Sequence, residues 1–241
     1  MNSNPQQFEG KIALITGASK GIGAAVAKAY AKAGTHVILL ARDTKKLEAV
    51  DDEIRTGGGQ ATLMPLDLMK LDELDKLGPT IYERFGRLDI FVGNAGMLGT
   101  LGPLAQISNR EFQHVMDTNL SANFRLIKTL DPLLQASEAG RAIFVSTGSG
   151  VVEGRAYWGT YSISKAALES MVRVYAAETA KTNLRVNIID PGGVRTDMRA
   201  AAKPGGDPMS LPAPEDIVET FLALAAPDCK KHGEVVRVGC S

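Results

Sequence analysis

The chain has 241 residues, and its 27 basic and 27 acidic side chains give a formal net charge of zero at neutral pH. No block of like charge and no apolar run of membrane-spanning length occurs, which argues against a nucleic-acid-binding surface and a membrane span. The polar first ten residues lack the order of a signal peptide, so we expect one cytoplasmic domain that covers residues 1–241.

Cysteine and histidine chemistry finds little support. Cys229 and Cys240 lie near the C-terminus and form neither a metal-binding spacing nor a disulfide framework. The three histidines, His36, His114 and His232, are scattered along the chain. We therefore predict no metal site.

The first predicted elements form a strand, a glycine turn and a helix. Lys11–Thr16 is a short apolar run, and an alanine-rich helix follows the turn and ends at Gly34. Glycines let the backbone approach a pyrophosphate, and the helix N-terminus offers it free N–H groups. The glycine spacing G-x-x-x-G-x-G differs from the dinucleotide fingerprint G-x-G-x-x-G, but the flanking elements favour a dinucleotide. The candidate cofactor residues of this turn are Gly17, Ser19, Lys20, Gly21, Ile22 and Gly23.

The second predicted strand, Val37–Leu40, ends where a carboxylate would meet the adenosine ribose of a dinucleotide. That place holds Ala41 and Arg42 instead. With Lys20 in the turn, two cations converge on the ribose, which indicates a 2′-phosphate. The alternative is that both cations are solvated surface residues.

Two segments in the middle of the chain carry further polar candidates. The small residues of Asn94-Ala95-Gly96 follow the predicted strand Leu88–Val92 and permit close backbone approach to a ligand. Asn119 lies inside a long helix that Ser108 caps and that runs to about Gln135. Asn119 is either a packing residue or, where the helix backbone is loosened, a residue that holds a water near a site.

The remaining predicted elements continue the same alternation of strands and helices. A hydroxyl cluster, Ser146-Thr147-Gly148-Ser149, follows one of these strands, and an Ala-, Pro- and Gly-rich segment within 197–214 is predicted to be a mobile substrate lid. The elements are a helix from Asp43 to Arg55, a strand Gln60–Pro65, a helix over 71–85 that Gly78-Pro79 can break, a strand Ala142–Val145, a helix from Tyr161 to about Lys181, a strand Leu184–Ile189, a helix Asp216–Ala225 and a strand Val235–Val238.

This rhythm predicts an α/β protein with a doubly wound parallel sheet and helices on both faces, in three layers. The functional edge of such a sheet is the carboxyl edge of its strands. Every glycine turn and hydroxyl cluster described above falls at that edge. We therefore expect one site there.

Tyr161 and Lys165 lie four residues apart on a predicted helix, so they share one face with Cβ atoms about 5–6 Å apart. At ~4 Å and an effective dielectric of ~20, a lysine charge contributes about 4 kcal/mol, enough to lower the phenol pKa from about 10 toward about 7. Desolvation acts in the opposite direction, so this lowering is an upper bound. The pair therefore indicates acid/base catalysis, the alternative being a packed Tyr and a solvated Lys.

From Gly10 to about Gly239 the chain resembles the short-chain dehydrogenases/reductases, which have a Rossmann-type fold. The turn Thr16-Gly17-x-x-x-Gly21-Ile22-Gly23 resembles the family's cofactor turn, and Tyr161-x-x-x-Lys165 its catalytic pair. Three further motifs occur in the right order: Asn94-Ala95-Gly96, Asn119, and Pro191-Gly192-x-Val194-x-Thr196, which resembles the segment that touches the nicotinamide.

The resemblance implies catalytic roles for residues of this chain. Tyr161 is the implied general acid/base, Lys165 lowers its pKa and binds the nicotinamide ribose, and Asn119 positions a water in a proton relay. The family's substrate-binding serine usually lies about thirteen residues before the tyrosine, where this chain has Gly148. Alignment from the preceding strand places it at Thr147, with Ser146 and Ser149 as neighbours, so the choice of hydroxyl stays open.

The resemblance also implies the cofactor and the assembly. Family members that prefer NAD have an acid where this chain has Ala41, whereas Lys20 and Arg42 match the pattern of those that prefer NADP. Asp67 and Leu68 resemble the residues around the adenine. We expect NADP(H) rather than NAD(H), a small carbonyl or alcohol substrate, and a homotetramer or homodimer. The rival hypothesis is a non-catalytic nucleotide-binding, redox-sensing module on the same fold.

Overall fold

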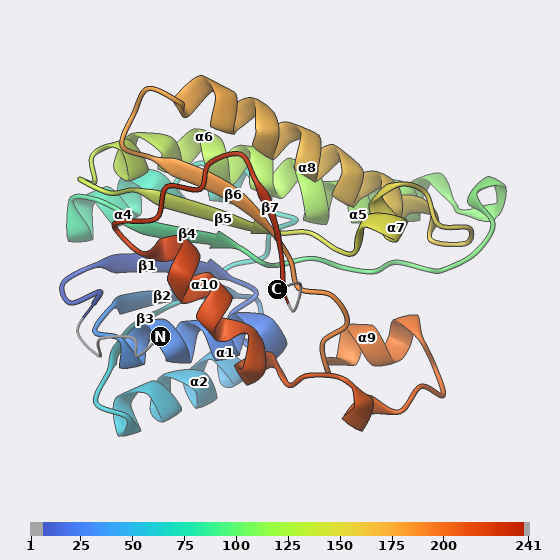
Figure 1. Ribbon diagram of the computed structural model, residues 1–241, viewed down its shortest axis with the longest axis horizontal. Coiled ribbons are helices and arrows are strands. Elements are labelled where there is room, and N and C mark those ends of the chain that lie inside the picture. Colours follow the sequence, from blue (N-terminus) through green and yellow to red (C-terminus); the bar gives the residue numbers. More distant parts are fainter. Residues whose placement is uncertain (1–6, 239–241) are drawn as a thin grey trace.

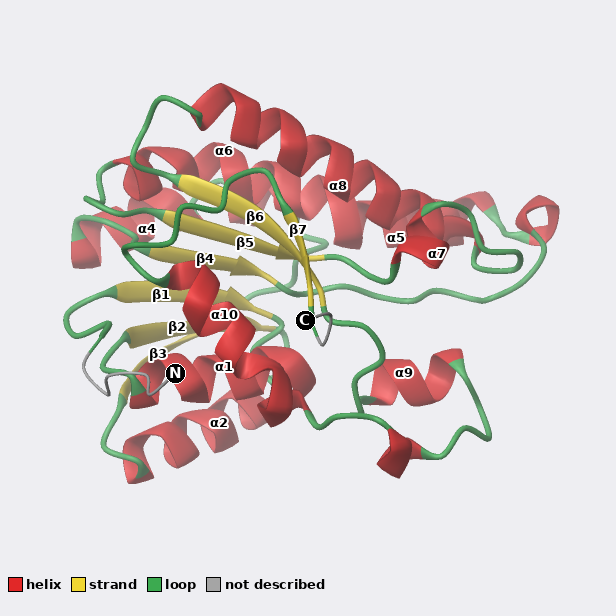
Figure 2. Cartoon of the chain, in the orientation of Figure 1, coloured by secondary structure: helices red, strands yellow, loops and turns green. Residues whose placement is uncertain are grey.

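The computed structural model describes residues 7–238, and within them seven parallel strands form one sheet in the order β3-β2-β1-β4-β5-β6-β7 (Figure 2). The predicted doubly wound parallel sheet is confirmed. The strands are β1 Ile12–Thr16, β2 His36–Ala41, β3 Gln60–Pro65, β4 Ile90–Gly93, β5 Arg141–Val145, β6 Arg185–Asp190 and β7 Val235–Arg237.

Helices cover both faces of the sheet, as Figure 1 shows. Side chains alternate along a strand, so Ile15 of β1 belongs to one buried apolar cluster and Leu14 to the other. One face carries α1 Gly21–Lys32, α2 Thr44–Thr56 and α10 Val218–Ala225; the other carries α3 Leu71–Leu74, α4 Leu77–Phe85, α5 Asn109–Met116, α6 Ala122–Gln135 and α8 Gly159–Thr179.

The strand order reverses between β1 and β4, which is where ligands bind in open α/β sheets. Thr16 at the end of β1 joins the two strands there. Its Oγ1 accepts hydrogen bonds from the backbone amides of Asn94 and Ala95, both at 3.0 Å, and its carbonyl accepts one from Asn94 Nδ2 at 2.9 Å. The glycine turn after β1 and the segment after β4 are therefore held side by side.

The helix predicted over residues 71–85 is interrupted, but not at Gly78-Pro79 as expected. The interruption falls at Asp75 and Lys76, and Gly78 and Pro79 lie in the first turn of α4. Proline is tolerated there because the first amides of a helix have no intrahelical partner. Gly78 allows close packing, since a Cβ on it would lie 2.2 Å from the carbonyl oxygen of Thr129.

The long helix predicted from Ser108 forms, and Ser108 caps it by accepting a hydrogen bond from the amide of Glu111. A π-helical turn over Asp117–Ser121 separates α5 from α6. The amide of Ala122 there donates to the carbonyl of Asp117, five residues back. The backbone is thus widened around Asn119, which the sequence pattern did not show.

The predicted lid segment contains regular structure. Thr196 caps the short helix α9, Asp197–Ala202, by accepting a hydrogen bond from the amide of Arg199. A second short helix, α7 at Ser149–Val152, was also not predicted. Both lie near the carboxyl edge of the sheet (Figure 1). Cys240, for which the sequence predicts neither a metal site nor a disulfide, lies outside the described residues. No helix within residues 7–238 has the length and hydropathy needed to cross a membrane.

Candidate active site

A cavity of about 950 Å³ opens along the carboxyl edge of the sheet. Gly23 and Asn119 lie outside its wall, whereas most residues predicted for the site lie in it. The wall includes Gly17, Ser19, Lys20, Gly21, Ile22, Arg42, Asp67, Leu68, Asn94, Ala95, Gly96, Ser146, Thr147, Tyr161, Lys165, Pro191, Gly192, Val194 and Thr196.

The glycine turn fits a pyrophosphate. Gly17 and Gly21 have φ angles of +66° and +56°, a region that side chains rarely adopt. A Cβ on Gly23 would lie 2.2 Å from the carbonyl oxygen of Gly17, so glycine is required for the turn to close against α1. Lys20 precedes α1 without a side-chain cap, so the first amides of this 12-residue helix stay available to an anion.

The two cations predicted for the ribose line the same cavity, but each contacts a carboxylate. Lys20 Nζ lies 2.6 Å from Asp197 Oδ2, and Arg42 Nη1 lies 4.0 Å from Asp67 Oδ2. Asp67 also accepts a hydrogen bond from the amide of Met69. Both pairs are largely exposed, so each contributes little to stability. A competing anion can therefore displace the carboxylates at low cost.

Tyr161 and Lys165 lie on the first turns of α8, and both are buried. Lys165 Nζ is 5.9 Å from the centroid of the Tyr161 ring and donates a 2.8 Å hydrogen bond to the carbonyl of Val145. Burial lowers the pKa of Lys165 to about 8, and the charge of Glu169 opposes this shift. The ammonium is thus held next to the phenol but is easier to deprotonate than an ordinary lysine.

The predicted lowering of the Tyr161 pKa is wrong for this structure. Burial raises the pKa of the Tyr161 phenol above its usual value, the neighbouring Thr147 side chain opposes this, and the charge of Asp190 adds to it. Removing a phenolate from water costs more than the neighbouring groups return. Tyr161 is therefore protonated at neutral pH.

Ser146 and Thr147, two of the three candidates for the substrate-binding hydroxyl, have different neighbours. The Thr147 side chain lies close enough to the Tyr161 phenol to lower its pKa, whereas Ser146 Oγ donates a 2.7 Å hydrogen bond to Glu169 Oε1 in the protein interior. Glu169 is also 2.7 Å from Arg173 Nη2. Both residues line the cavity, but the Ser146 hydroxyl is already bonded to Glu169, which favours Thr147 as the hydroxyl next to the phenol.

Asn119 is fully buried behind the cavity wall. Its side chain exchanges two hydrogen bonds with the backbone of Met97, at 2.8 and 2.9 Å, and donates a third to Ser164 Oγ at 2.9 Å. The backbone carbonyl of Asn119 accepts a hydrogen bond from Asn123 Nδ2 at 2.8 Å. The side chain therefore fixes the segment after β4 against α8, which matches the packing interpretation of this residue.

The apolar residues of the lid segment differ in whether they reach the cavity. Met198 lies in the cavity wall, but Met209 is 74% exposed and Leu211 packs toward Gly193 instead. Trp158 does line the cavity, and its ring centroid lies 6.0 Å from that of Tyr161. The Arg155 guanidinium lies over the Trp158 ring, 5.2 Å from the ring centroid.

Several wall residues were missed by the sequence analysis, among them His114, Thr118, Arg195 and Arg199. His114 and Thr118 come from α5 and the π-helical turn and Arg199 from the lid, which no cofactor motif covers, whereas Arg195 stands at an unspecified position of the Pro191–Thr196 motif. Glu169 was also missed, although its position four residues after Lys165 places it on the same helix face. Among residues 7–238, no three His, Cys, Asp or Glu side chains gather as a metal site would require.

Comparison with known proteins identifies close relatives of this chain. A family model described as short chain dehydrogenase matches residues 11–206. The uncharacterized oxidoreductase YciK of Escherichia coli K12 is 41% identical over 236 residues, covering 96% of this chain and 93% of its own.

Two solved structures share both sequence and fold with the chain. A short chain dehydrogenase of Escherichia coli CFT073 complexed with NADPH has a TM-score of 0.94 and 40% identity, covering 98% of this chain and 99% of its own. One from Shigella flexneri 2a complexed with NADP has a TM-score of 0.93 and 39% identity, covering 97% and 99%.

Proposed function

This chain belongs to the short-chain dehydrogenase family, and on that premise we propose that it is an NADP(H)-dependent oxidoreductase acting on a carbonyl or secondary alcohol. The observation that carries the proposal is the position of the Tyr161 phenol, close to the Thr147 side chain and next to Lys165 in the wall of the large cavity. A proton donor, a second hydroxyl and a cation thus meet where the predicted cofactor residues converge.

Tyr161 is the proposed general acid in carbonyl reduction. Its raised pKa keeps the phenol protonated, so it can give its proton to the substrate oxygen. Thr147 hydrogen-bonds the same oxygen, and Lys165 stabilises the phenolate that remains. In alcohol oxidation the proton returns to Tyr161. The nicotinamide, when bound, supplies or accepts the hydride.

Asn119 supports this arrangement through its backbone contacts. We retain for Asn119 the predicted role of positioning a water in a proton relay. The π-helical turn widens the backbone around Asn119, so that its backbone carbonyl accepts a side-chain hydrogen bond. In the structure that carbonyl accepts the Asn123 side-chain amide. A relay water would therefore share the carbonyl with Asn123.

The proposed cofactor is NADP(H) rather than NAD(H). Two solved relatives were crystallised with NADP or NADPH, in agreement with the prediction from the sequence. Lys20 and Arg42 line the cavity, and Ala41 offers no carboxylate to a free 2′-hydroxyl. A 2′-phosphate would replace Asp197 and Asp67 as partner of these two cations.

The remaining cavity residues are proposed to contact different parts of the cofactor. Asp67 and Leu68 would surround the adenine, and the glycine turn with Asn94-Ala95-Gly96 would hold the pyrophosphate and its neighbouring ribose. The nicotinamide would lie against the segment after β6, which contains Pro191, Gly192, Val194 and Thr196. Residues 197–214 would then close over it as a lid.

Turnover of NADPH decides between this proposal and its rival, a nucleotide-binding module without catalysis. We expect the protein to oxidise NADPH, followed at 340 nm, in the presence of at least one member of a panel of aldehydes, ketones, quinones and acyl thioesters. NADPH binding with no turnover of any panel member would favour the non-catalytic module.

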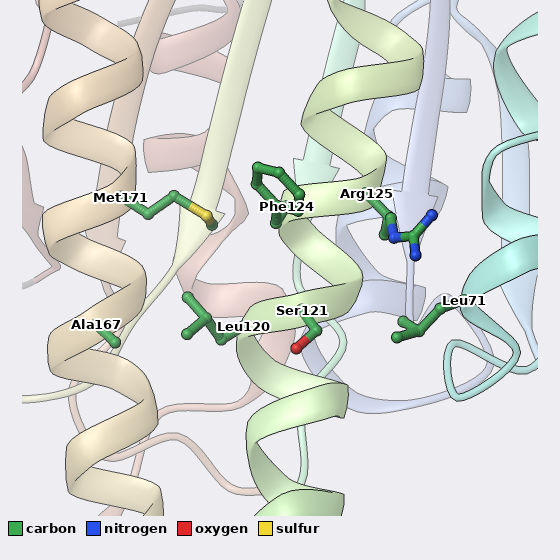
Figure 3. A pocket seen from close by; sticks show the side chains of 7 residues that line it. All are labelled: Leu71, Leu120, Ser121, Phe124, Arg125, Ala167 and Met171. Carbon is green, nitrogen blue, oxygen red and sulfur yellow. The ribbon is translucent and has the colours of Figure 1, made fainter.

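We also propose that the protein is a homodimer or homotetramer joined through α6 and α8. A groove of about 520 Å³ lies between these helices, and Figure 3 shows Met171 and Ala167 of α8 facing Phe124 and Leu120 across it. Phe124 is 54% exposed and so is Val174 on α8. Exposed apolar side chains on neighbouring helices are typical of an interface.

The mass in solution tests this assembly. We expect light scattering to give a dimer or tetramer, and Phe124→Glu to lower the mass. Tyr82→Glu, at an aromatic residue that is 66% exposed on α4, is the control and should keep the mass unchanged. A monomeric wild type would refute the assembly. The cytoplasmic location stays a prediction from the sequence.

A further inference from the structure

Charges in the cavity are unevenly distributed. Each acidic residue of the wall lies within 4.0 Å of a basic residue of the wall, the pairs being Lys20 with Asp197, Arg42 with Asp67 and Lys46 with Asp43. All three pairs belong to the end at which the 2′-phosphate is proposed to bind. Among residues 7–238, no carboxylate in the wall remains to neutralise Arg199 of the lid and Arg195 just before it, which are together called the lid arginines.

Arg199 lies in the cavity wall beside the segment after β6, against which the nicotinamide is proposed to lie. Its backbone amide is fixed by the Thr196 cap of α9, and its guanidinium lies along Gly193. A Cβ on Gly193 would be 3.6 Å from Arg199 Nε and 3.8 Å from its Cζ. The guanidinium therefore lies in van der Waals range of the segment that begins at Pro191.

Arg195 also lacks a charged partner within the described chain. Its Nη1 lies 2.9 Å from the Met209 sulfur, a weak acceptor without charge. Its amide donates to the carbonyl of Pro212, which ties its backbone to the end of the lid. Both lid arginines are thus positioned by backbone contacts and have donor groups left for a ligand.

Apolar side chains make up much of the rest of this end of the cavity. The ring centroids of Trp158 and Tyr161 are 6.0 Å apart. The backbone amide of Met97 donates a hydrogen bond to Asn119, which fixes the position of this residue. The apolar wall residues here are Met97, Leu98, Trp158, Met198, Ala202 and Pro214. A ligand that matches this wall has an apolar body and one anionic end.

We propose that the substrate is an apolar carbonyl compound that carries an oxyanion, and that Arg199, assisted by Arg195, binds this oxyanion. The proposal rests on the proposed function and names the substrate class of that same site. Arginine suits the task because its planar guanidinium can donate two parallel hydrogen bonds to a carboxylate or a phosphate. The cofactor phosphates have other partners, namely the α1 N-terminus, Lys20 and Arg42.

Binding can be measured without turnover, because Trp158 is the only tryptophan in the chain and lines the cavity. The probes are 4-formylbenzoate and its uncharged methyl ester, titrated into the protein loaded with NADP⁺ while Trp158 fluorescence is recorded. We expect the carboxylate to bind about 10- to 100-fold more tightly than the ester, the range of a charge-assisted hydrogen bond. The preference should shrink as salt is added.

Variants assign the preference to the lid arginines. Arg199→Met should bring the ratio of the two dissociation constants close to one, and Arg199→Lys should keep part of it. Arg195→Met, a second variant in case Arg199→Met does not fold, should lower the ratio by a smaller factor. Arg84→Met is the matched control, because Arg84 is an exposed arginine of α4, outside the cavity wall, and it should leave the ratio unchanged.

Three results would overturn the inference. They are equal binding of carboxylate and ester by the wild type, a preference that survives in both Arg199→Met and Arg195→Met, and a loss of NADP⁺ affinity in Arg199→Met as large as the loss of carboxylate affinity. The last would show that the arginine serves the cofactor. A protein that binds 4-formylbenzoate through Arg199 but oxidises NADPH with no carbonyl compound would instead refute the proposed function alone.

Discussion

The Ser146 hydroxyl donates a 2.7 Å hydrogen bond to the Glu169 carboxylate, and both side chains are buried. Thr147, the next residue, lies close to the Tyr161 phenol instead and lowers its pKa. Successive side chains of extended backbone point to opposite sides, so the residues that follow β5 separate these two hydroxyls. Both residues line the cavity, but only the Ser146 hydroxyl is bonded to an interior carboxylate.

Thr147 substitutions test which hydroxyl meets the substrate oxygen. Thr147→Val, similar in shape, should lower kcat/KM by about 5- to 150-fold, the equivalent of one hydrogen bond of about 1–3 kcal/mol. Thr147→Ser should keep most of the activity, and Ser146→Ala should cost less than Thr147→Val. Steady-state kinetics with one substrate check this, and the assignment fails if Ser146→Ala proves the more damaging change.

Glu169 should set the pH range of activity through Lys165. Its charge raises the pKa of Lys165, so Glu169→Gln should lower that pKa further below the present value of about 8. If the ammonium is required, activity falls as the pH rises through this pKa, and in Glu169→Gln the fall should begin at lower pH. Glu178→Gln, an exposed glutamate on the same helix, is the control for the kcat/KM profiles. An unchanged alkaline limb in Glu169→Gln would argue against the coupling.

The cofactor preference should depend on Ala41 and Arg42. Charge-assisted hydrogen bonds of about 1.5–3 kcal/mol each from Arg42 and Lys20 favour NADPH over NADH by roughly 10²–10⁴ in affinity, and salt screening shifts this toward the lower end. The double change Ala41→Asp with Arg42→Ala should reverse the preference. Dissociation constants for both cofactors measure it. Equal or tighter binding of NADH by the wild type would contradict the assignment.

Asp197 should weaken NADPH binding slightly, because its carboxylate occupies Lys20. Exposed ion pairs are worth about 0.2–1 kcal/mol, so Asp197→Asn should tighten NADPH by at most about fivefold. NADH, which lacks the phosphate, should not gain. Asp207→Asn, at another exposed lid aspartate, controls for the change in net charge. Weaker NADPH binding in Asp197→Asn would mean that Asp197 itself supports the cofactor.

The sequence predicted the sheet and the position of the site because both depend on local patterns. Apolar runs and glycine turns specify the strands and their carboxyl ends, and parallel pairing brings those ends together. The family motifs then place Tyr161, Lys165 and the glycine turn in one cavity wall, where the structure has them.

The features that were missed depend on tertiary contacts. Asp197, the partner of Lys20, lies 177 residues further along the chain, and Glu169, the partner of Ser146, lies 23 residues further. No local sequence pattern predicts either contact. The Tyr161 pKa depends on how deeply α8 is buried, so a pairwise estimate with Lys165 had the wrong sign. The π-helical turn Asp117–Ser121 keeps its apolar Leu120 in the spacing of the helix, so the apolar pattern alone did not show the turn.

The most direct test of the central claim is the turnover of Tyr161→Phe. This change removes only the phenolic oxygen, so NADPH affinity should stay within about twofold of wild type while kcat falls by roughly 10²–10⁴. The measurement is single-turnover oxidation of bound NADPH at 340 nm with the best carbonyl substrate of the panel. A rate within about twofold of wild type would show that Tyr161 is not the proton donor.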